Sequence, residues 1–479
     1  MEISVERYHY PIGQGTFSAQ IIRTKEDEVE KEKYVCVYDC GSTTSKVGKS
    51  NVEKFAKELY EKSSRIINML VISHLDEDHV NGVRKLYKER FRIKKVVLPY
   101  MTRWERLLYV LSRTEDNSCV YDSLSSERAF FKFIINNSHG EGSDDDITDG
   151  DLDGVVVEFS DVEISRDPVR IVDTPLGNIF WEFVHFSLYS GGGDIFESNV
   201  IDDFAAKIRE NYEREEEFPS EKTFSIEELR NLRNIYNEVY DSHRKNNNEN
   251  RKALNSNRSS IILYSGLERS SYGICMGLSR HMELGYVWNY NKYVTYKWIA
   301  AGVLCTCHLG VSNNLMGLNH GDCCKDYSSC ANFEYHNVYE NASYENSALH
   351  YKGEFPVIGW LGTGDAELHV VNNCWELVRK LGAWRLSQVR EMTIPHHGSK
   401  NGSSSFFFSL FNAENKIICI IHSQISGGYV KGNKVIHGKY GHPHKEVCAN
   451  IWNAENLTPV HVTEDVRTKY QSITSIDIS

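Results

Sequence analysis

Short apolar runs alternate with polar turns along the first 200 residues of the chain. The runs have the length and β-branched content of strands, and they lie at 17–23, 34–41, 67–74, 94–100, 155–159 and 179–186. Segments with apolar side chains at helical spacing, such as 51–62, separate them. The alternation predicts layers of sheet and helix, of either the α/β or the α+β class.

Two stretches interrupt this pattern. Residues 201–258 are charged and polar, and they contain one amphipathic helix predicted from Leu229, Leu232, Ile235 and Val239. Residues 267–355 are rich in Cys, Tyr and Asn, whereas strand-like runs return at 259–266 and after 355. We therefore predict a single domain over residues 1–479, with a charged helical insertion at 201–258 and a Cys/Tyr/Asn-rich insertion at 267–355.

Composition limits the expected partners and the expected cellular location of the protein. The 479 residues carry a formal net charge of −12, so there is no global attraction to nucleic acid, and any polyanion must meet a local patch. The sequence has no run of about 18 apolar residues and no basic and apolar leader. We expect a cytoplasmic protein that does not bind membranes, with its twelve cysteines kept as thiols.

Candidate chemistry first appears at residues 71–82, VISHLDEDHVNG. His74, Asp76, Asp78 and His79 follow an apolar run that is typical of a strand buried on both faces. A loop at the edge of a sheet is where open α/β folds place their sites. Imidazole and carboxylate are ligands of divalent metals, and four of them within six residues could hold two adjacent ions. The alternative is a solvated acidic loop with incidental histidines.

This stretch resembles the HxHxDH signature of the metallo-β-lactamase fold, in the variant whose second His is Asp. That variant is typical of the hydrolase domain of ComEC-type DNA-uptake proteins. Five more segments resemble motifs of that domain in the same order: YPIGQGTFSAQII (10–22), VCVYDCGS (35–42), LGTGD (361–365), TIPHHGS (393–399) and YGHPHKEV (440–447). The chain departs from the pattern at Thr16, where the relatives usually have Asp.

The resemblance implies an α+β fold, a four-layer αββα sandwich, with a dinuclear metal site at one edge. His74 and Asp76 would hold one ion, Asp78 and His79 the other, and Asp365 would bridge them. One of His396 and His397 would be a ligand while its neighbour faces the substrate, and which is which stays open. His185 is the best placed candidate for one further ligand, although a hydrogen-bonded histidine on a core strand is an equal alternative.

The resemblance also implies the activity. We expect a metal-dependent hydrolase, a phosphodiesterase or nuclease, that uses metal-bound hydroxide, with Asp78, His396 and His442 as catalytic residues and His442 and His444 in contact with the substrate. The ions would be zinc or manganese, with magnesium also open, because the Asp at position 76 suits harder metals. Two alternatives remain: a hydrolase of a small ester, lactone or cyclic nucleotide, and a partner-binding protein with a structural metal site that contacts its partner through the insertions.

Two further features bear on partners and metals. The stretch from Arg84 to Arg106 is locally basic, so Lys94 and Lys95 could contact a nucleic-acid or nucleotide substrate, although a solvated face is the alternative. In the second insertion, Cys305, Cys307 and His308 precede three more cysteines, Cys323, Cys324 and Cys330. They predict either a structural zinc or buried free thiols.

Overall fold

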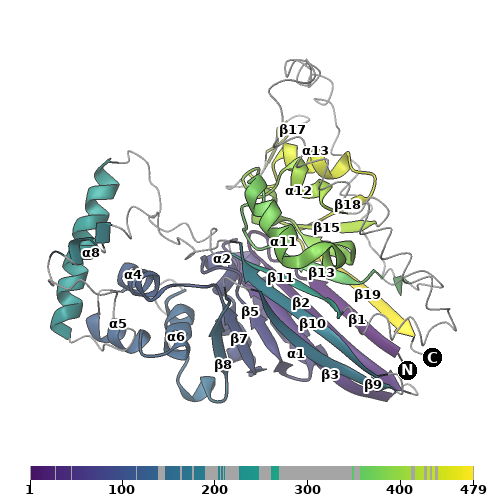
Figure 1. Cartoon of the computed structure of the whole chain (residues 1–479), viewed down its shortest axis with the longest axis horizontal. Coiled ribbons are helices and arrows are strands. Elements are labelled where there is room, and N and C mark those ends of the chain that lie inside the picture. Colours follow the sequence, from purple (N-terminus) through teal and green to yellow (C-terminus); the bar gives the residue numbers. More distant parts are fainter. Residues whose placement is uncertain are drawn as a thin grey trace.

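The computed structural model describes most of residues 2–188, parts of 203–246, residues 260–268, the pair 348–349 and most of 357–477. Two large sheets dominate this part of the chain (Figure 1). Both contain parallel and antiparallel strand pairs, and helices flank them, which agrees with the predicted α+β class. No helix within the described ranges is long and apolar enough to cross a membrane.

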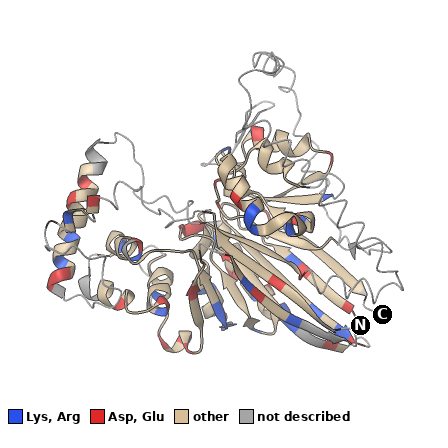
Figure 2. Ribbon diagram, in the orientation of Figure 1, with Lys and Arg blue, Asp and Glu red and all other residues tan. Residues whose placement is uncertain are grey.

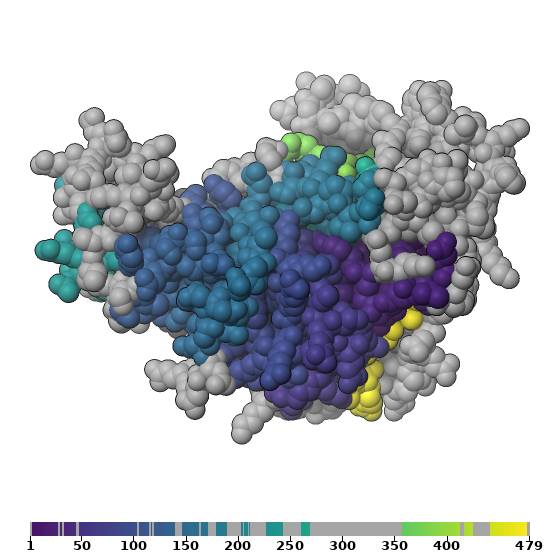
Figure 3. All heavy atoms as spheres, turned by 90° about the horizontal axis from the view of Figure 1, so that it is seen from below, coloured from purple at the N-terminus to yellow at the C-terminus, as the bar shows by residue number. Residues whose placement is uncertain are grey.

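The first sheet has eight strands. Their order across the sheet is β12 (Ala348–Leu349), β19 (Tyr470–Asp477), β1 (Glu2–His9), β2 (Phe17–Glu26), β3 (Val29–Cys40), β5 (Met69–Val71), β7 (Lys95–Leu98) and β8 (Val156–Phe159). The last strand of the chain pairs antiparallel with the first, so the two ends of the sequence meet in one sheet. Figure 3 shows residues near the C-terminus, in yellow, against the purple N-terminal segment.

The second sheet has seven strands. Their order is β18 (Leu457–Val462), β15 (Ile417–His422), β14 (Val389–Thr393), β13 (Gly359–Gly362), β11 (Ile261–Leu267), β10 (Gly177–Ser187) and β9 (Ser165–Thr174). Strands β9, β10 and β11 pair antiparallel, whereas β13, β14, β15 and β18 pair parallel through helical crossovers. The sheet therefore joins residues from the middle of the chain with residues near its end.

Alternating side chains place each sheet between two apolar regions. On β3, Cys36 and Tyr38 belong to a cluster that includes buried residues of both sheets, whereas Val35 and Val37 face helices. On β11, Leu263 belongs to the shared cluster and Tyr264 faces a different set of helices. The helices whose buried residues join the apolar cluster of the first sheet are α1 (Lys46–Ser63), α3 (Val83–Lys88), α4 (Arg103–Arg113), α5 (Asn117–Ser123) and α6 (Glu127–Asn137), and α8 (Ile226–Asn246) extends this cluster by packing on α4 and α5. The helices on the second sheet are α11 (Val371–Ser387), α12 (Ser405–Ser409) and α13 (Lys445–Trp452).

The predicted helix of the first insertion is present as α8. Its apolar residues Leu229, Leu232, Ile235 and Val239 are buried, and α8 contacts α4 and α5 (Figure 1). Acidic and basic residues are interspersed along α8 (Figure 2). The division into one domain and two insertions stays a prediction, because nearly all of 267–355, with its cysteines, lies outside the described residues.

A charged network is buried between the two sheets. The carboxylate of Glu391 on β14 accepts a hydrogen bond from Ser472 on β19 at 2.7 Å and lies 2.7 Å from Nε2 of His9 on β1. Nη1 of Arg7 lies 3.9 Å from the same carboxylate. Burial opposes ionisation of Glu391, but His9, Arg7 and Ser472 together lower its pKa below the ordinary 4.5. Glu391 therefore links the second sheet to two strands of the first.

Replacing this carboxylate tests the link. Glu391→Gln should lower the free energy of unfolding by about 3 kcal/mol at pH 7, because Arg7 then keeps a buried charge without its partner. The stabilisation is fully present above pH 4.5 and is lost as pH falls through the lowered pKa of Glu391. Urea unfolding of both proteins between pH 3 and 8 should therefore show a difference that shrinks in acid. A difference that is constant with pH would contradict an ionised Glu391.

Candidate metal centre

The predicted motif residues lie where β5 leaves the first sheet. The backbone continues past Val71, where the N–H of Ile72 still donates to Val97 on β7, and it then turns into the short helix α2 (Glu77–Val80). His74 and His79 are fully buried, and their ring centroids are 3.9 Å apart. Two imidazoles from one short loop therefore converge on one buried position.

The carboxylate of Asp365, which follows β13, lies at the centre of four histidines. Its Oδ2 is 3.7 Å from Nε2 of His74 and 3.7 Å from Nε2 of His396. Its Oδ1 is 3.5 Å from Nε2 of His79 and 3.7 Å from Nε2 of His397. Each oxygen of Asp365 therefore faces its own pair of imidazoles.

The two remaining acids of the motif extend this division. Oδ2 of Asp76 lies 4.0 Å from Nε2 of His74, and Oδ2 of Asp78 lies 3.2 Å from Nε2 of His397. Two sets of three side chains can each hold a metal ion: His74, His79 and Asp365, and Asp78, His79 and His397. The structure thus brings together seven of the eight predicted metal ligands.

The PHHG turn aims both of its histidines at Asp365. His396 and His397 have φ values of 50° and 55°, in the left-handed region that non-glycine residues seldom adopt. The N–H of His396 donates to the carbonyl of Gly364 at 3.0 Å, and Nδ1 of His397 lies 3.0 Å from the carbonyl of His422. These contacts fix the turn directly beside Asp365, so strained backbone coincides with the candidate site.

Asp39 at the end of β3 supports the site from behind, a role that sequence analysis did not assign. Its Oδ2 lies 2.8 Å from Nδ1 of His79, and its Oδ1 accepts the N–H of Ser73 at 2.6 Å. A carboxylate on Nδ1 sets the tautomer of the ring and directs Nε2 towards Asp365. The Asp-x-Gly end of segment 35–42 was the available signal, but only the fold shows which histidine it serves.

Glycines let three segments approach one another beneath the motif. A Cβ on Gly15 would lie 2.6 Å from the carbonyl oxygen of Asp78, and a Cβ on Gly41 would lie 2.7 Å from the backbone of Asp78 and His79. The N–H of Thr16 donates to that same carbonyl of Asp78 at 3.1 Å. The GQG and Asp-x-Gly segments therefore set the position of the Asp78–His79 turn through backbone packing.

The electrostatics of the cluster favour a bound cation. Burial opposes ionisation of Asp365, yet the four surrounding histidines hold its pKa below the usual range. Burial alone would lower the pKa of His79, but Asp39, Asp78 and Asp365 raise it to about 10. Nε2 of His74, Nε2 of His79 and Oδ1 of Asp365 are buried and have no hydrogen-bond partner among the described residues. These donor atoms fit a metal ion, which would satisfy them together.

The two histidines of the GHPH segment lie beside the exposed side of the cluster. The ring centroid of His442 is 5.6 Å from that of His396, and its Nδ1 lies 3.3 Å from Nδ1 of His444. Burial and the neighbouring histidines lower the pKa of His442 to about 3. His442 is therefore uncharged at neutral pH and can contact a ligand by a hydrogen bond.

The structure places two other predicted residues, His185 and Lys95, in a different group. Nε2 of His185 lies 3.2 Å from Oδ2 of Asp167, and its Nδ1 lies 3.1 Å from Oγ of Ser160. Nζ of Lys95 lies 2.8 Å from Asp167 and 2.7 Å from Glu158.

His185, Asp167 and Glu158 have the spacing of a metal site, but the ammonium of Lys95 already bridges the two carboxylates. His185 therefore has the hydrogen-bonded environment of the alternative interpretation. Lys94 is exposed and precedes the first residue of β7. The roles of His185 as a ligand and of Lys94 and Lys95 as substrate contacts stay predictions.

Comparisons with known proteins add little. No family model matches the sequence, and no curated protein matches it. Among solved structures, the crystal structure of a long form RNase Z from yeast is similar at 14% sequence identity, with a TM-score of 0.14. The matched region covers 38% of this chain and 27% of that chain. Similarity this low supports no inference about fold or activity.

The glycine packing yields a prediction. Gly41→Ala should lower the free energy of unfolding by about 1–3 kcal/mol, because the new methyl group would overlap the backbone of Asp78 and His79. Gly150→Ala is the matched control, since the nearest atom to its Cβ would be 3.6 Å away, and it should change stability by less than about 0.5 kcal/mol. Chemical denaturation measures both variants. Equal stability of the two would show that the turn can shift without cost.

Proposed function

We propose that the protein is a metal-dependent phosphodiesterase of the metallo-β-lactamase fold, with two divalent ions held around Asp365. The observation that carries this proposal is the division of one buried carboxylate between two pairs of histidines. A carboxylate used in this way is suited to bridging two adjacent ions. Two adjacent ions are the arrangement that phosphatases and nucleases use to stabilise both the attacking and the leaving oxygen.

The packing of the chain supports the four-layer αββα part of the proposal. Two apolar clusters combine residues of both sheets, and two others combine one sheet with its own helices. Figure 1 shows α11, α12 and α13 beside the second sheet, and α6 beside β8 of the first, with α4, α5 and α8 further out. The candidate site lies in the loops that follow β5, β13 and β14, which is the edge where the resemblance expects it.

The distances favour a ligand division that differs in one respect from the one implied by the resemblance. His74, Asp76 and His396 would hold the first ion, and Asp78, His79 and His397 the second, with Asp365 between them. Both histidines of the PHHG turn are then ligands. His396 takes the position for which His185 was the sequence candidate, since His185 contacts Asp167 and Ser160. Each half combines imidazole with carboxylate, which suits zinc or manganese.

The side chains around the ions have separate tasks in this proposal. Bound divalent ions would supply Lewis acidity that activates water near neutral pH. Asp39 fixes the tautomer of His79. Asp78, whose carboxylate lies 3.2 Å from Nε2 of His397, would bind an ion together with His397 and would also orient the water. His442 and His444, beside His396, would contact the phosphoryl group of a substrate through hydrogen bonds.

The ligand division can be tested by metal content. Wild-type protein equilibrated with Mn²⁺ or Zn²⁺ and then desalted should retain two ions per chain by elemental analysis. His396→Ala and His397→Ala should each lose about one ion, and Asp365→Ala should lose both, because each removes a donor from a shared centre. His444→Ala is the control and should keep both ions. Full retention in His396→Ala would return His396 to the substrate side.

The activity itself needs a substrate panel. The metal-loaded protein should cleave bis-p-nitrophenyl phosphate and at least one of single-stranded DNA, duplex DNA, RNA or a cyclic nucleotide. Asp78→Ala should reduce turnover by 10²-fold or more with circular dichroism unchanged, because it removes a ligand at the reacting centre. Turnover of carboxylic esters or lactones but of no phosphodiester would favour the small-ester alternative. Retained metal without turnover of any substrate would favour the partner-binding alternative.

A further inference from the structure

Ser73 lies directly before the first motif histidine, and its polar groups are engaged inside the protein. The residue is completely buried. Its N–H donates to Oδ1 of Asp39 at 2.6 Å, and its carbonyl accepts the N–H of Ile261 at 2.8 Å. Asp39 belongs to β3 of the first sheet, whereas Ile261 begins β11 of the second. Ser73 therefore joins the two sheets beside the candidate metal centre.

The hydroxyl of Ser73 connects Asp39 to the ring of His74. Oγ of Ser73 donates to Oδ2 of Asp39 at 2.7 Å and lies 3.0 Å from Nδ1 of His74. Because the single hydroxyl proton is given to Asp39, Oγ can only accept from the His74 ring. Nδ1 of His74 then carries the ring proton, and Nε2 keeps the lone pair that a metal ion needs. Nε2 of His74 is buried without a hydrogen-bond partner among the described residues, which agrees with this assignment.

The same carboxylate oxygen also holds the second motif histidine. Oδ2 of Asp39 lies 2.8 Å from Nδ1 of His79, closer than Oγ of Ser73 at 3.3 Å. Asp39 therefore sets the tautomer of both rings, that of His79 directly and that of His74 through one hydroxyl. In the ligand division proposed above, His74 binds the first ion and His79 the second. One oxygen atom thus reaches both halves of the site.

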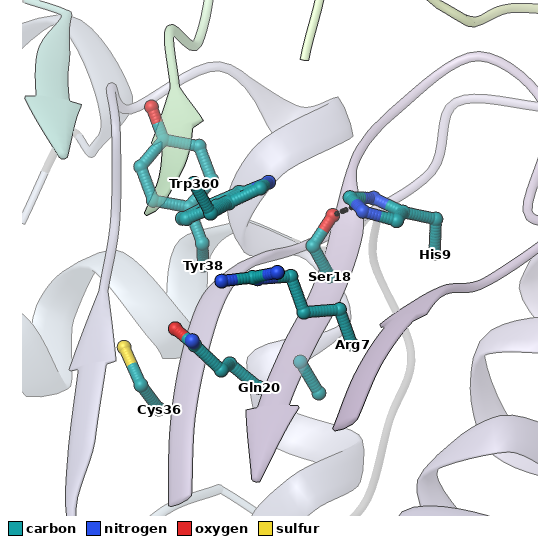
Figure 4. A pocket seen from close by; sticks show the side chains of 8 residues that line it. Arg7, His9, Ser18, Gln20, Cys36, Tyr38 and Trp360 are labelled. Atoms are coloured by element: carbon teal, nitrogen blue, oxygen red, sulfur yellow. Dashed lines mark hydrogen bonds between the residues drawn. The ribbon is translucent and has the colours of Figure 1, made fainter. Parts of the chain in front are cut away.

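Neighbouring residues fix the positions of Asp39 and Ser73. Asp39 has a φ of 57°, in the left-handed region, so the backbone is strained at the residue that supplies the carboxylate. A Cβ on Gly364 would lie 2.7 Å from Cβ of Ser73, so the loop after β13 packs directly on the serine. Next to Asp39 in the chain, the ring of Tyr38 packs edge to face on Trp360, with centroids 5.3 Å apart (Figure 4). This packing keeps Oγ of Ser73 within reach of its partners.

We propose that Ser73 is a positioning residue that connects the two halves of the metal centre by relaying the hydrogen bond of Asp39 to His74. The inference rests on the proposed function, because it concerns the affinity for the ions held around Asp365. Loss of the Ser73 hydroxyl should weaken binding of the first ion, whereas loss of the Asp39 carboxylate should weaken binding of both. Hydrogen-bond partners of metal-binding histidines typically change metal affinity by about 10–100-fold.

Variants that keep a single ion test the serine. In His397→Ala, which should keep the first ion, Ser73→Ala should raise the Kd for Mn²⁺ by about 10–100-fold, because the His74 ring is then free to rotate or to change tautomer. In His396→Ala, which should keep the second ion, the same change should raise the Kd by less than about 3-fold. Competition with a chelator of known affinity measures all of these values.

Ser265→Ala is the matched control. Ser265 is also a completely buried serine between the sheets, and its hydroxyl donates to Gln20 and accepts from Trp181 instead of contacting a proposed ligand. Its replacement should lower the free energy of unfolding as Ser73→Ala does, and it should leave the Kd for Mn²⁺ unchanged. Loss of a buried hydroxyl is thereby separated from loss of the relay.

Asp39→Asn tests the relay even if Ser73→Ala does not fold. Asn tolerates the left-handed φ, so the backbone can keep its position. With its oxygen accepting the N–H of Ser73, the new amide would donate to Nδ1 of His79 and to Oγ of Ser73, and the hydroxyl would then donate to His74. Both rings would carry the proton on Nε2, the atom that must bind metal. The Kd for Mn²⁺ should therefore rise in both single-ion variants.

The possible outcomes separate this inference from the proposed function. Wild-type protein that retains no Mn²⁺ would overturn the proposed function, and the inference with it. Two retained ions together with equal effects of Ser73→Ala in the two single-ion variants would overturn the inference alone. An effect of Asp39→Asn that is confined to the second ion would do the same, because it would show that nothing passes from Asp39 to His74.

Discussion

The candidate site depends on one buried carboxylate that lies among four imidazoles. Asp365 and its histidines are almost completely withdrawn from water, and His396 retains the largest exposure among them at 24%. Concentrating ionisable groups in this way is unfavourable unless a counter-charge holds them together. In the proposed function, the two oxygens of Asp365, each facing two Nε2 atoms, would bind two adjacent cations. In the proposed function these ions supply both the cohesion of the site and its chemistry.

The fold provides this concentration through parts far apart in the sequence. The motif loop leaves the first sheet after β5, whereas Asp365 and the PHHG turn leave the second sheet after β13 and β14. The two sheets must therefore be held at a fixed distance for the loops to meet. Apolar packing supplies most of that contact, and the Arg7–His9–Glu391 network adds directional links inside it.

Local backbone detail then sets the orientation of each ligand. Gly15 and Gly41 allow two segments to pack directly against the backbone of the Asp78–His79 turn. Asp39 selects the tautomer of His79, and the carbonyl of His422 does the same for His397. These supporting groups contact no substrate in the proposed mechanism. They would nevertheless control affinity for metal, because a ring that rotates loses its ligand atom.

The sequence by itself determined the local features. Apolar alternation placed most strands, helical spacing found α8, and the His/Asp spacing of residues 74–79 identified the loop that carries the chemistry. The predicted strand at 67–74 was less regular than expected, since it divides into β4 (Ile66–Ile67) and β5 at Asn68, whose backbone and side chain both bond Val35. Motif resemblance also named Asp365 and the PHHG pair. The assignment of α8 to an insertion remains a prediction, and so does the Cys/Tyr/Asn-rich insertion at 267–355.

Only the tertiary structure decided how these features combine. Spacing cannot tell whether His396 or His397 faces the cluster, because both answers fit the same four letters; the left-handed turn brings both to Asp365. Sequence analysis likewise gave equal weight to His185 as a metal ligand and to His185 as a hydrogen-bonded histidine on a core strand. Its contacts with Asp167 and Ser160 follow from sheet packing. The physical reason is the same in each case. A side chain's partner on another strand or loop is fixed by strand order and by the distance between sheets, and local periodicity carries neither.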